Sequence, residues 1–164
     1  MPIHEFSVIA TGLDPTDPAF ERRFFEAGCE DAMVSFQRGH IIVEFAREAV
    51  SIIDALQSAQ RDVERGGAVV ERIEPDPLVS LSDMAERTGM TRQAITNYAS
   101  GQRREDFPAP IARITSTSPL WDWAEAAAWF GQQGVLPGDD VVQARAVADA
   151  NRELARHRRP LLVP

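Results

Sequence analysis

The chain of 164 residues contains no lysine, a single tyrosine and a single cysteine. Because Cys29 is alone, no disulfide can form within the chain, and the cysteine usage gives no indication of an oxidising compartment. No apolar run approaches the roughly 18 residues that a membrane span needs. The first residues also lack the basic-then-apolar layout of a secretory signal. These absences predict a globular cytoplasmic protein without a membrane partner.

The residues that usually carry metal or nucleophilic chemistry are scattered. His4, His40 and His157 have no partner at the spacing of a metal site. Two acidic residues follow Cys29 directly, and negative neighbours raise the pKa of a thiol, which opposes its use as a nucleophile. The chain has neither a glycine-rich phosphate loop nor a Gly-x-Ser-x-Gly motif. We therefore expect no enzyme activity, no metal site and no cofactor.

Charge is unevenly distributed along the chain. The 25 acidic residues outnumber 17 basic ones, all arginine, and the net charge is −8. Residues 1–76 carry 7 Arg against 15 Asp and Glu, whereas residues 77–130 carry 5 against 6 and residues 131–164 carry 5 against 4. Within residues 79–104 there are 4 Arg and 2 acidic residues. A weakly positive segment on an acidic body can bind a preferred DNA site while it attracts random DNA poorly.

The first 75 residues follow the order strand, helix, strand, strand, helix, strand. Alternating apolar residues, apolar stripes at helical spacing and turn residues support this order. The expected elements are strands at 6–10, 32–36, 40–45 and 68–73, and helices at 18–27 and about 48–65. The order predicts a ferredoxin-like βαββαβ domain over residues 1–75, with a four-stranded antiparallel sheet backed by two helices.

Two breaks divide the rest of the chain. Pro75 and Pro77 disfavour both helix and central strand, so they mark a boundary. After it the pattern is mostly helical as far as a second break at residues 131–138. A last helix is expected over residues 139–157, and its apolar side has no obvious partner within residues 78–130. The expected fold is therefore α+β, with a ferredoxin-like domain at 1–75, a mostly helical domain at 78–130 and a C-terminal helix.

Residues 79–104 have the pattern of two short helices joined by a tight turn. Ser80 and Asp83 stand at the spacing of a capping box, which begins a helix. Gly89 lies at the turn, where the chain is expected to need a positive φ. Thr91 can cap the second helix. This spacing is typical of a helix-turn-helix.

The second helix, residues 92–100, presents two different faces. Ala94, Ile95 and Tyr98 are expected to face the core. Arginine binds guanine bidentately, Gln and Asn bind adenine, and a Thr methyl contacts a thymine methyl. The N-terminus of a helix attracts a phosphate. The expected base-contacting residues are Arg92, Gln93, Thr96 and Asn97. The expected phosphate contacts of this helix are Thr91 and Ser100.

The helix-turn-helix is followed by Phe107-Pro108-Ala109-Pro110, an expected strand at 111–114, a polar turn and Trp121-Asp122-Trp123. With these features, residues 78–130 resemble the winged helix-turn-helix regulators of the MerR and excisionase superfamily. The resemblance implies a wing and phosphate or minor-groove contacts from Arg103, Arg104 and Arg113. The chain departs from that group in its order, with the DNA reader second, and in lacking a cysteine-rich effector site.

The predicted function is that of a sequence-specific transcriptional regulator that binds double-stranded DNA. The alternatives are an excisionase-like or architectural factor of a mobile element, and a protein–protein adaptor that has lost DNA binding. The N-terminal domain is expected to dimerise or to sense a small-molecule or protein effector. A homodimer is expected through the open face of the sheet, with Met33, Ile42 and Val70 on it, or through the C-terminal helix.

Overall fold

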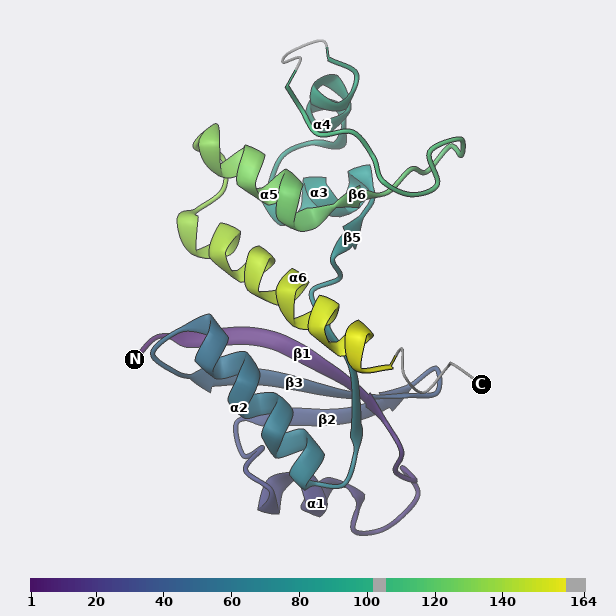
Figure 1. The fold of residues 1–164 in the computed structure, drawn as a ribbon, viewed down its shortest axis with the longest axis vertical. Helices are drawn as coiled ribbons and strands as arrows, with labels where there is room; N and C mark the ends of the chain where they lie inside the picture. The colour runs from purple at the N-terminus through teal and green to yellow at the C-terminus, as the bar shows by residue number, and fades with distance from the viewer. Residues whose placement is uncertain (102–105, 159–164) are drawn as a thin grey trace. The chain divides into compact units, whose positions relative to one another are not determined.

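A computed structural model describes residues 1–101 and 106–158. It is an α+β protein with a four-stranded antiparallel sheet and six helices in the described ranges, which confirms the expected class (Figure 1). The chain divides into two compact units. The sheet unit comprises Met1–Pro75 and the chain from Ala146 onward, and the helical unit comprises Asp76–Arg145. No helix within the described ranges is long and apolar enough to cross a membrane.

The sheet unit begins with six elements in the order that the sequence predicts. They are β1 (Ile3–Thr11), α1 (Phe20–Glu26), β2 (Ala32–Gln37), β3 (His40–Glu48), α2 (Ile52–Arg65) and β4 (Val69–Glu74). The strand order is β2-β3-β1-β4, and each neighbouring pair is antiparallel. Arg38 and Gly39 form the two-residue turn between β2 and β3, and both have the positive φ that such a turn needs.

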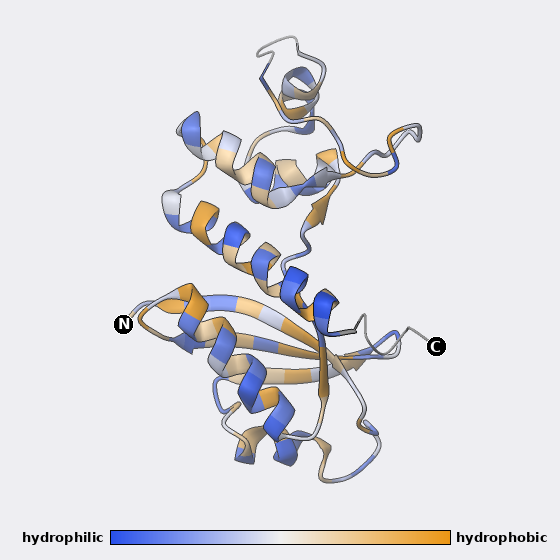
Figure 2. Ribbon diagram, viewed as in Figure 1, coloured by the Kyte–Doolittle hydropathy of each residue, from blue (hydrophilic) through white to orange (hydrophobic). Residues whose placement is uncertain are grey.

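Helix α2 begins at Ile52, later than expected, because β3 continues to Glu48. Ser51 caps the helix, and its hydroxyl oxygen accepts a hydrogen bond from the N–H of Asp54. The buried residues of α2 form one stripe: Ile52, Ala55, Leu56, Ala59 and Val63. Figure 2 shows the matching alternation of apolar and polar residues along α2 and along α6 (Gly138–Arg158).

Alternation along the strands gives the sheet one covered and one open face. Val8, Val34 and Val43 oppose one another on the covered face, where residues of α1, α2 and α6 complete the core. The prediction that Val70 lies on the open face is wrong: Val70 is 6% exposed and lies on the covered face, whereas Val69 is 58% exposed. The pairing of β1 with β4 shifts register between Ile9 and Ala10, and such a bulge reverses the faces beyond it.

The buried charged side chain of the sheet unit is Arg47 on β3. Its guanidinium binds the Asp31 carboxylate through two hydrogen bonds, Nε to Oδ2 at 2.8 Å and Nη2 to Oδ1 at 3.0 Å. Nη1 lies 2.9 Å from Oδ2 of Asp62 and donates to the hydroxyl of Ser58, while Nη2 also donates to the carbonyl of Gly28. Hydrogen bonding to Asp31 raises the pKa of Arg47, against the opposing effect of burial. The guanidinium thus joins β3, α2 and the segment between α1 and β2.

Cys29 is buried next to this cluster. Burial is the main cause that raises the pKa of its thiol to about 11, and the negative charge of Asp62 adds to it. The direction expected from the sequence is confirmed, although burial outweighs the neighbouring acids.

We expect iodoacetamide at pH 8 to modify Cys29 roughly a hundredfold more slowly in the folded chain than in urea. A rise of the pKa from 9.0 to about 11 lowers the thiolate fraction by about that factor. Mass spectrometry of timed samples measures both rates, and the folded-state rate should increase with pH until about 11. Equal rates in the two states would contradict the burial of this thiol.

The helical unit contains β5 (Leu78–Val79), α3 (Leu81–Thr88), α4 (Arg92–Ala99), β6 (Trp121–Asp122), α5 (Trp123–Gln132) and the first part of α6. β5 pairs with β6 in an antiparallel ribbon that the sequence pattern does not predict. The expected strand at 111–114 is wrong, because only Ala112 bridges to Leu120. Arg113 adopts a left-handed φ of 51°, and its carbonyl accepts hydrogen bonds from Ser116, so the chain turns there instead of pairing.

The apolar side of α6 has partners within its own chain, contrary to expectation. Val141 and Ala144 pack in the core of the helical unit. Ala146 and Val147 are buried in the core of the sheet unit. Residues of α6 thus contribute to both cores. The helix therefore offers less apolar surface to a second copy than its sequence indicates.

Candidate nucleic-acid interface

The turn between α3 and α4 is built from local hydrogen bonds. The Ser80 hydroxyl accepts from the N–H of Asp83 at 3.2 Å, and the Asp83 carboxylate accepts from the N–H of Ser80 at 2.9 Å. This confirms the expected capping box. Gly89 directly follows the last residue of α3, and its φ of 71° confirms the expected positive value. The chain can therefore reverse direction within a few residues and begin α4 at once.

Thr91 caps the N-terminus of helix α4, as expected. The Thr91 hydroxyl oxygen accepts a hydrogen bond from the N–H of Ala94 at 3.1 Å, and its own proton remains available to a ligand. The first N–H groups of a helix have no intrahelical partner, and they form the positive end of its dipole. This end of α4 thus has the donors that a phosphate contact from Thr91 requires.

The inner face of α4 determines the rotation of the helix. Ile95 is fully buried, as expected, in the core that also contains Met84. The ring of Tyr98 lies edge-on to Trp129, with ring centroids 5.0 Å apart, and is stacked on Phe107 at 6.3 Å. Because Ile95 and Tyr98 pack into the core from successive positions of one face, the opposite face of α4 is directed outwards.

That opposite face carries the predicted base-contacting residues. Arg92 and Gln93 are exposed, and Thr96 and Asn97 are half-buried. The Gln93 amide nitrogen donates to the Asn97 amide oxygen at 3.0 Å, one helical turn away. The Thr96 hydroxyl donates to the carbonyl of Arg92 at 2.9 Å, so its proton is already used. The pair of linked amides was not predicted, although two amide side chains at i and i+4 are a signal for it.

Three further predicted contacts lie at or beyond the end of α4. Ser100 is exposed, and its hydroxyl donates to the carbonyl of Asn97. Arg103 and Arg104 lie outside the described residues. All three predicted contacts therefore follow α4 directly in the sequence.

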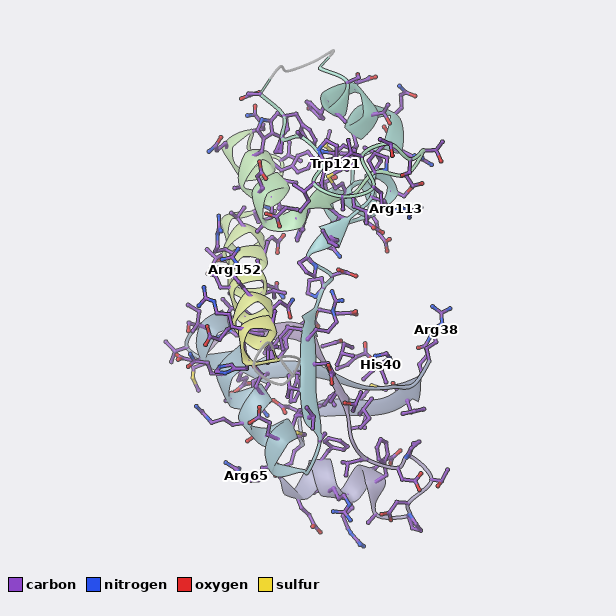
Figure 3. All side chains as sticks on the ribbon, turned by 45° about the vertical axis from the view of Figure 1, so that its right-hand side comes forward. Arg38, His40, Arg65, Arg113, Trp121 and Arg152 are labelled. Carbon is purple, nitrogen blue, oxygen red and sulfur yellow. The ribbon has the colours of Figure 1, made fainter. Side chains whose placement is uncertain are left out.

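Arg113 is the remaining predicted contact, and it lies in the loop between Ala112 and Leu120. Its side chain is exposed (Figure 3). The base of the loop is anchored by the indole N–H of Trp121, which donates to the carbonyl of Pro108 at 3.0 Å. The loop is thus attached to a buried aromatic residue, while Arg113 remains accessible.

One positive charge of this region has a structural role instead. The guanidinium of Arg87 lies over the ring of Trp123, 5.2 Å from its centroid, and donates to the carbonyl of Asp76. It therefore stabilises the junction between α3 and the β5–β6 ribbon. Of the four arginines in residues 79–104, Arg92 is the one that the described part of the structure presents on the outer face of α4.

The described residues contain no group of three or more His, Cys, Asp and Glu side chains that could hold a metal ion. Comparison of the chain with protein-family models, with curated proteins and with solved structures gives no match. The geometry of α3 and α4 and the chemistry of their side chains are therefore the features that point to a function.

Proposed function

We propose that the helical unit is a winged helix-turn-helix domain that binds double-stranded DNA with α4 in the major groove. The observation that carries the proposal is the pair of hydrogen-bonded amides, Gln93 and Asn97, on the outer face of a helix whose rotation is held by Ile95 and Tyr98. Such a helix can be inserted into a groove without rearrangement of its own core.

The linked amides suit an A·T pair. When the Gln93 nitrogen donates to the Asn97 oxygen, the Asn97 amide nitrogen and the Gln93 amide oxygen keep donor and acceptor capacity. Adenine presents an acceptor, N7, next to a donor, the N6 amino group, in the major groove. The exposed guanidinium of Arg92 has the geometry that guanine prefers. In this proposal the loop from Ala112 to Leu120 is the wing, and Arg103, Arg104 and Arg113 bind phosphates or the minor groove.

We further propose that the sheet unit is a ferredoxin-like domain that serves dimerisation or effector sensing; its element order and its strand order β2-β3-β1-β4 support this. The whole chain would then act as a transcriptional regulator on the nucleoid in the cytoplasm. Footprinting on genomic fragments tests this role. Protection at a promoter would support a regulator, protection at an attachment site would indicate an excision factor, and no protection would indicate an adaptor.

We expect Gln93→Ala or Asn97→Ala to weaken binding to the preferred site by roughly 1–3 kcal/mol and to reduce discrimination at one base pair. Each substitution removes one amide and leaves the other without its partner. Fluorescence anisotropy with matched and mismatched duplexes at one salt concentration measures both effects. Gln132→Ala removes an exposed glutamine of the same unit, at the end of α5, and is the control. If all three variants bind like the parent, α4 does not read bases.

A further inference from the structure

The outer edge of β2 is unusual for a protein with so many charges. No described strand pairs along this edge, and the six residues of β2, AMVSFQ, include neither a charge nor a proline. Met33 is 75% exposed and Phe36 is 45% exposed. Natural proteins usually protect an edge strand with charges, prolines or a covering segment, because free backbone N–H and C=O groups are a template for another strand.

The opposite edge of the same sheet is protected in this way. The Asn151 side chain of α6 accepts a hydrogen bond from the N–H of Ile73 at 2.7 Å and donates one to its carbonyl at 2.9 Å. β4 also carries charged residues along its length, and Pro75 follows it. The contrast between the two edges indicates that the exposure of β2 is specific to that strand.

The open face of the sheet is a poor surface for a second copy. The register places Glu5, Glu44 and Glu74 around Ser7 on this face, with Glu48 on the same side of β3. These carboxylates outnumber the guanidinium of Arg72, which lies opposite Ile9 on the same face. Two copies that met face to face would bring these like charges together. Electrostatic repulsion therefore favours the edge over the face, although Met33 and Ile42 of the face are apolar.

We propose that β2 pairs with β2 of a second copy, antiparallel across a two-fold axis, so that two four-stranded sheets become one. Gln37 and His40 flank the two-residue turn, which is the position of a hydrogen-bonded pair. In an antiparallel ladder, residues that bond to the partner strand alternate with residues that do not. The backbone N–H and C=O groups of Val34 and Phe36 therefore point away from β3. With the axis near Ser35, Val34 of each copy lies opposite Phe36 of the other copy. Residue contacts are then reciprocal, as in any two-fold interface.

The charges beside the strand fit this arrangement. Glu30 precedes β2, and Arg38 and His40 follow it, all three with exposed side chains. Antiparallel pairing places the start of each strand against the end of the other, so each Glu30 lies near the Arg38 and His40 of the second copy. Figure 3 shows Arg38 and His40 at the end of the hairpin, projecting from the sheet unit. The attraction between Glu30 and Arg38 occurs on both sides of the axis, which gives a self-complementary surface.

Sedimentation velocity without DNA tests the pairing, so its outcome is independent of the proposed DNA binding. The parent chain should have twice the 18.1 kDa mass of one copy at micromolar concentration. Phe36→Pro removes a backbone N–H that points outwards and makes no hydrogen bond to β3. In a two-fold dimer this N–H is lost from both copies, so two hydrogen bonds disappear. Association should therefore weaken roughly 30-fold. Phe36→Ala loses the same ring but keeps the N–H, so it should associate more tightly than the proline variant. Circular dichroism shows whether each variant is folded.

A charge exchange gives a second test on exposed residues that the core does not need. Glu30→Arg or Arg38→Glu alone should weaken the dimer about tenfold, because like charges then meet on both sides of the axis. The double variant should recover the parent's association. A monomeric parent would overturn the proposal. A dimer that is insensitive to Phe36→Pro and to both charge reversals would show that the copies meet elsewhere, and would also overturn it.

Discussion

Replacing Arg47 with Met should lower the free energy of unfolding by about 3 kcal/mol, at the lower end of the range for breaking a buried ion pair. The substitution keeps most of the side-chain volume but leaves the carboxylates of Asp31 and Asp62 without the guanidinium that joins them. Asp31 is partly exposed and regains some hydration, which is why the lower end applies.

Urea unfolding followed by circular dichroism measures this loss. Arg61→Met is the matched control, because Arg61 is exposed on α2 and its replacement should change stability by less than about 0.5 kcal/mol. Arg47→Lys should lie between the parent and Arg47→Met, since an ammonium keeps the charge but cannot reproduce the fork of five donors. Parent-like stability of Arg47→Met would show that the two carboxylates do not depend on this contact.

Replacing Ile95 with Ala should cost about 2–5 kcal/mol, because the side chain is fully buried in the core of the helical unit and the substitution leaves a cavity. Differential scanning calorimetry measures the loss. Ile111→Ala removes the same atoms from an exposed position of the same unit and should have little effect.

Ile95→Ala also tests which face of α4 is turned inwards. At a temperature where the variant is still folded, its DNA affinity should remain close to that of the parent, whereas Gln93→Ala should show normal stability and weakened binding. An Ile95→Ala variant that melts like the parent and yet loses DNA binding would show that the faces of α4 are reversed.

Local signals in the sequence were sufficient for the turn between α3 and α4. The capping box at Ser80, the left-handed Gly89 and the Thr91 cap each involve groups within three residues of one another, so short-range sterics and hydrogen bonding determine them. The order of strands and helices in residues 1–75 was predictable for the same reason, since each element shows its own hydrophobic period.

Features that depend on pairing between distant segments were missed. The register shift between β1 and β4 moved Val70 to the covered face, although nothing in residues 68–73 indicates a bulge. The β5–β6 ribbon joins residues more than 40 positions apart, and the carbonyl of Pro77 accepts a hydrogen bond from the N–H of Trp123, the first residue of α5. The positive φ of Arg113 ended the strand expected at 111–114.

The sequence by itself determined the fold class, the positions of most helices and strands and the polar face of α4, because these follow from local propensity and period. Only the tertiary structure decided the partners: the guanidinium of Arg47 finds acceptors on two separate segments, the one before β2 and α2, and Asn151 protects the edge of β4 from 78 residues away. The unprotected edge of β2 could be recognised only by comparison with the protected edge of β4 in the folded sheet. Side-chain and backbone polar groups are satisfied by whatever the fold brings near them, and a linear pattern does not contain that information.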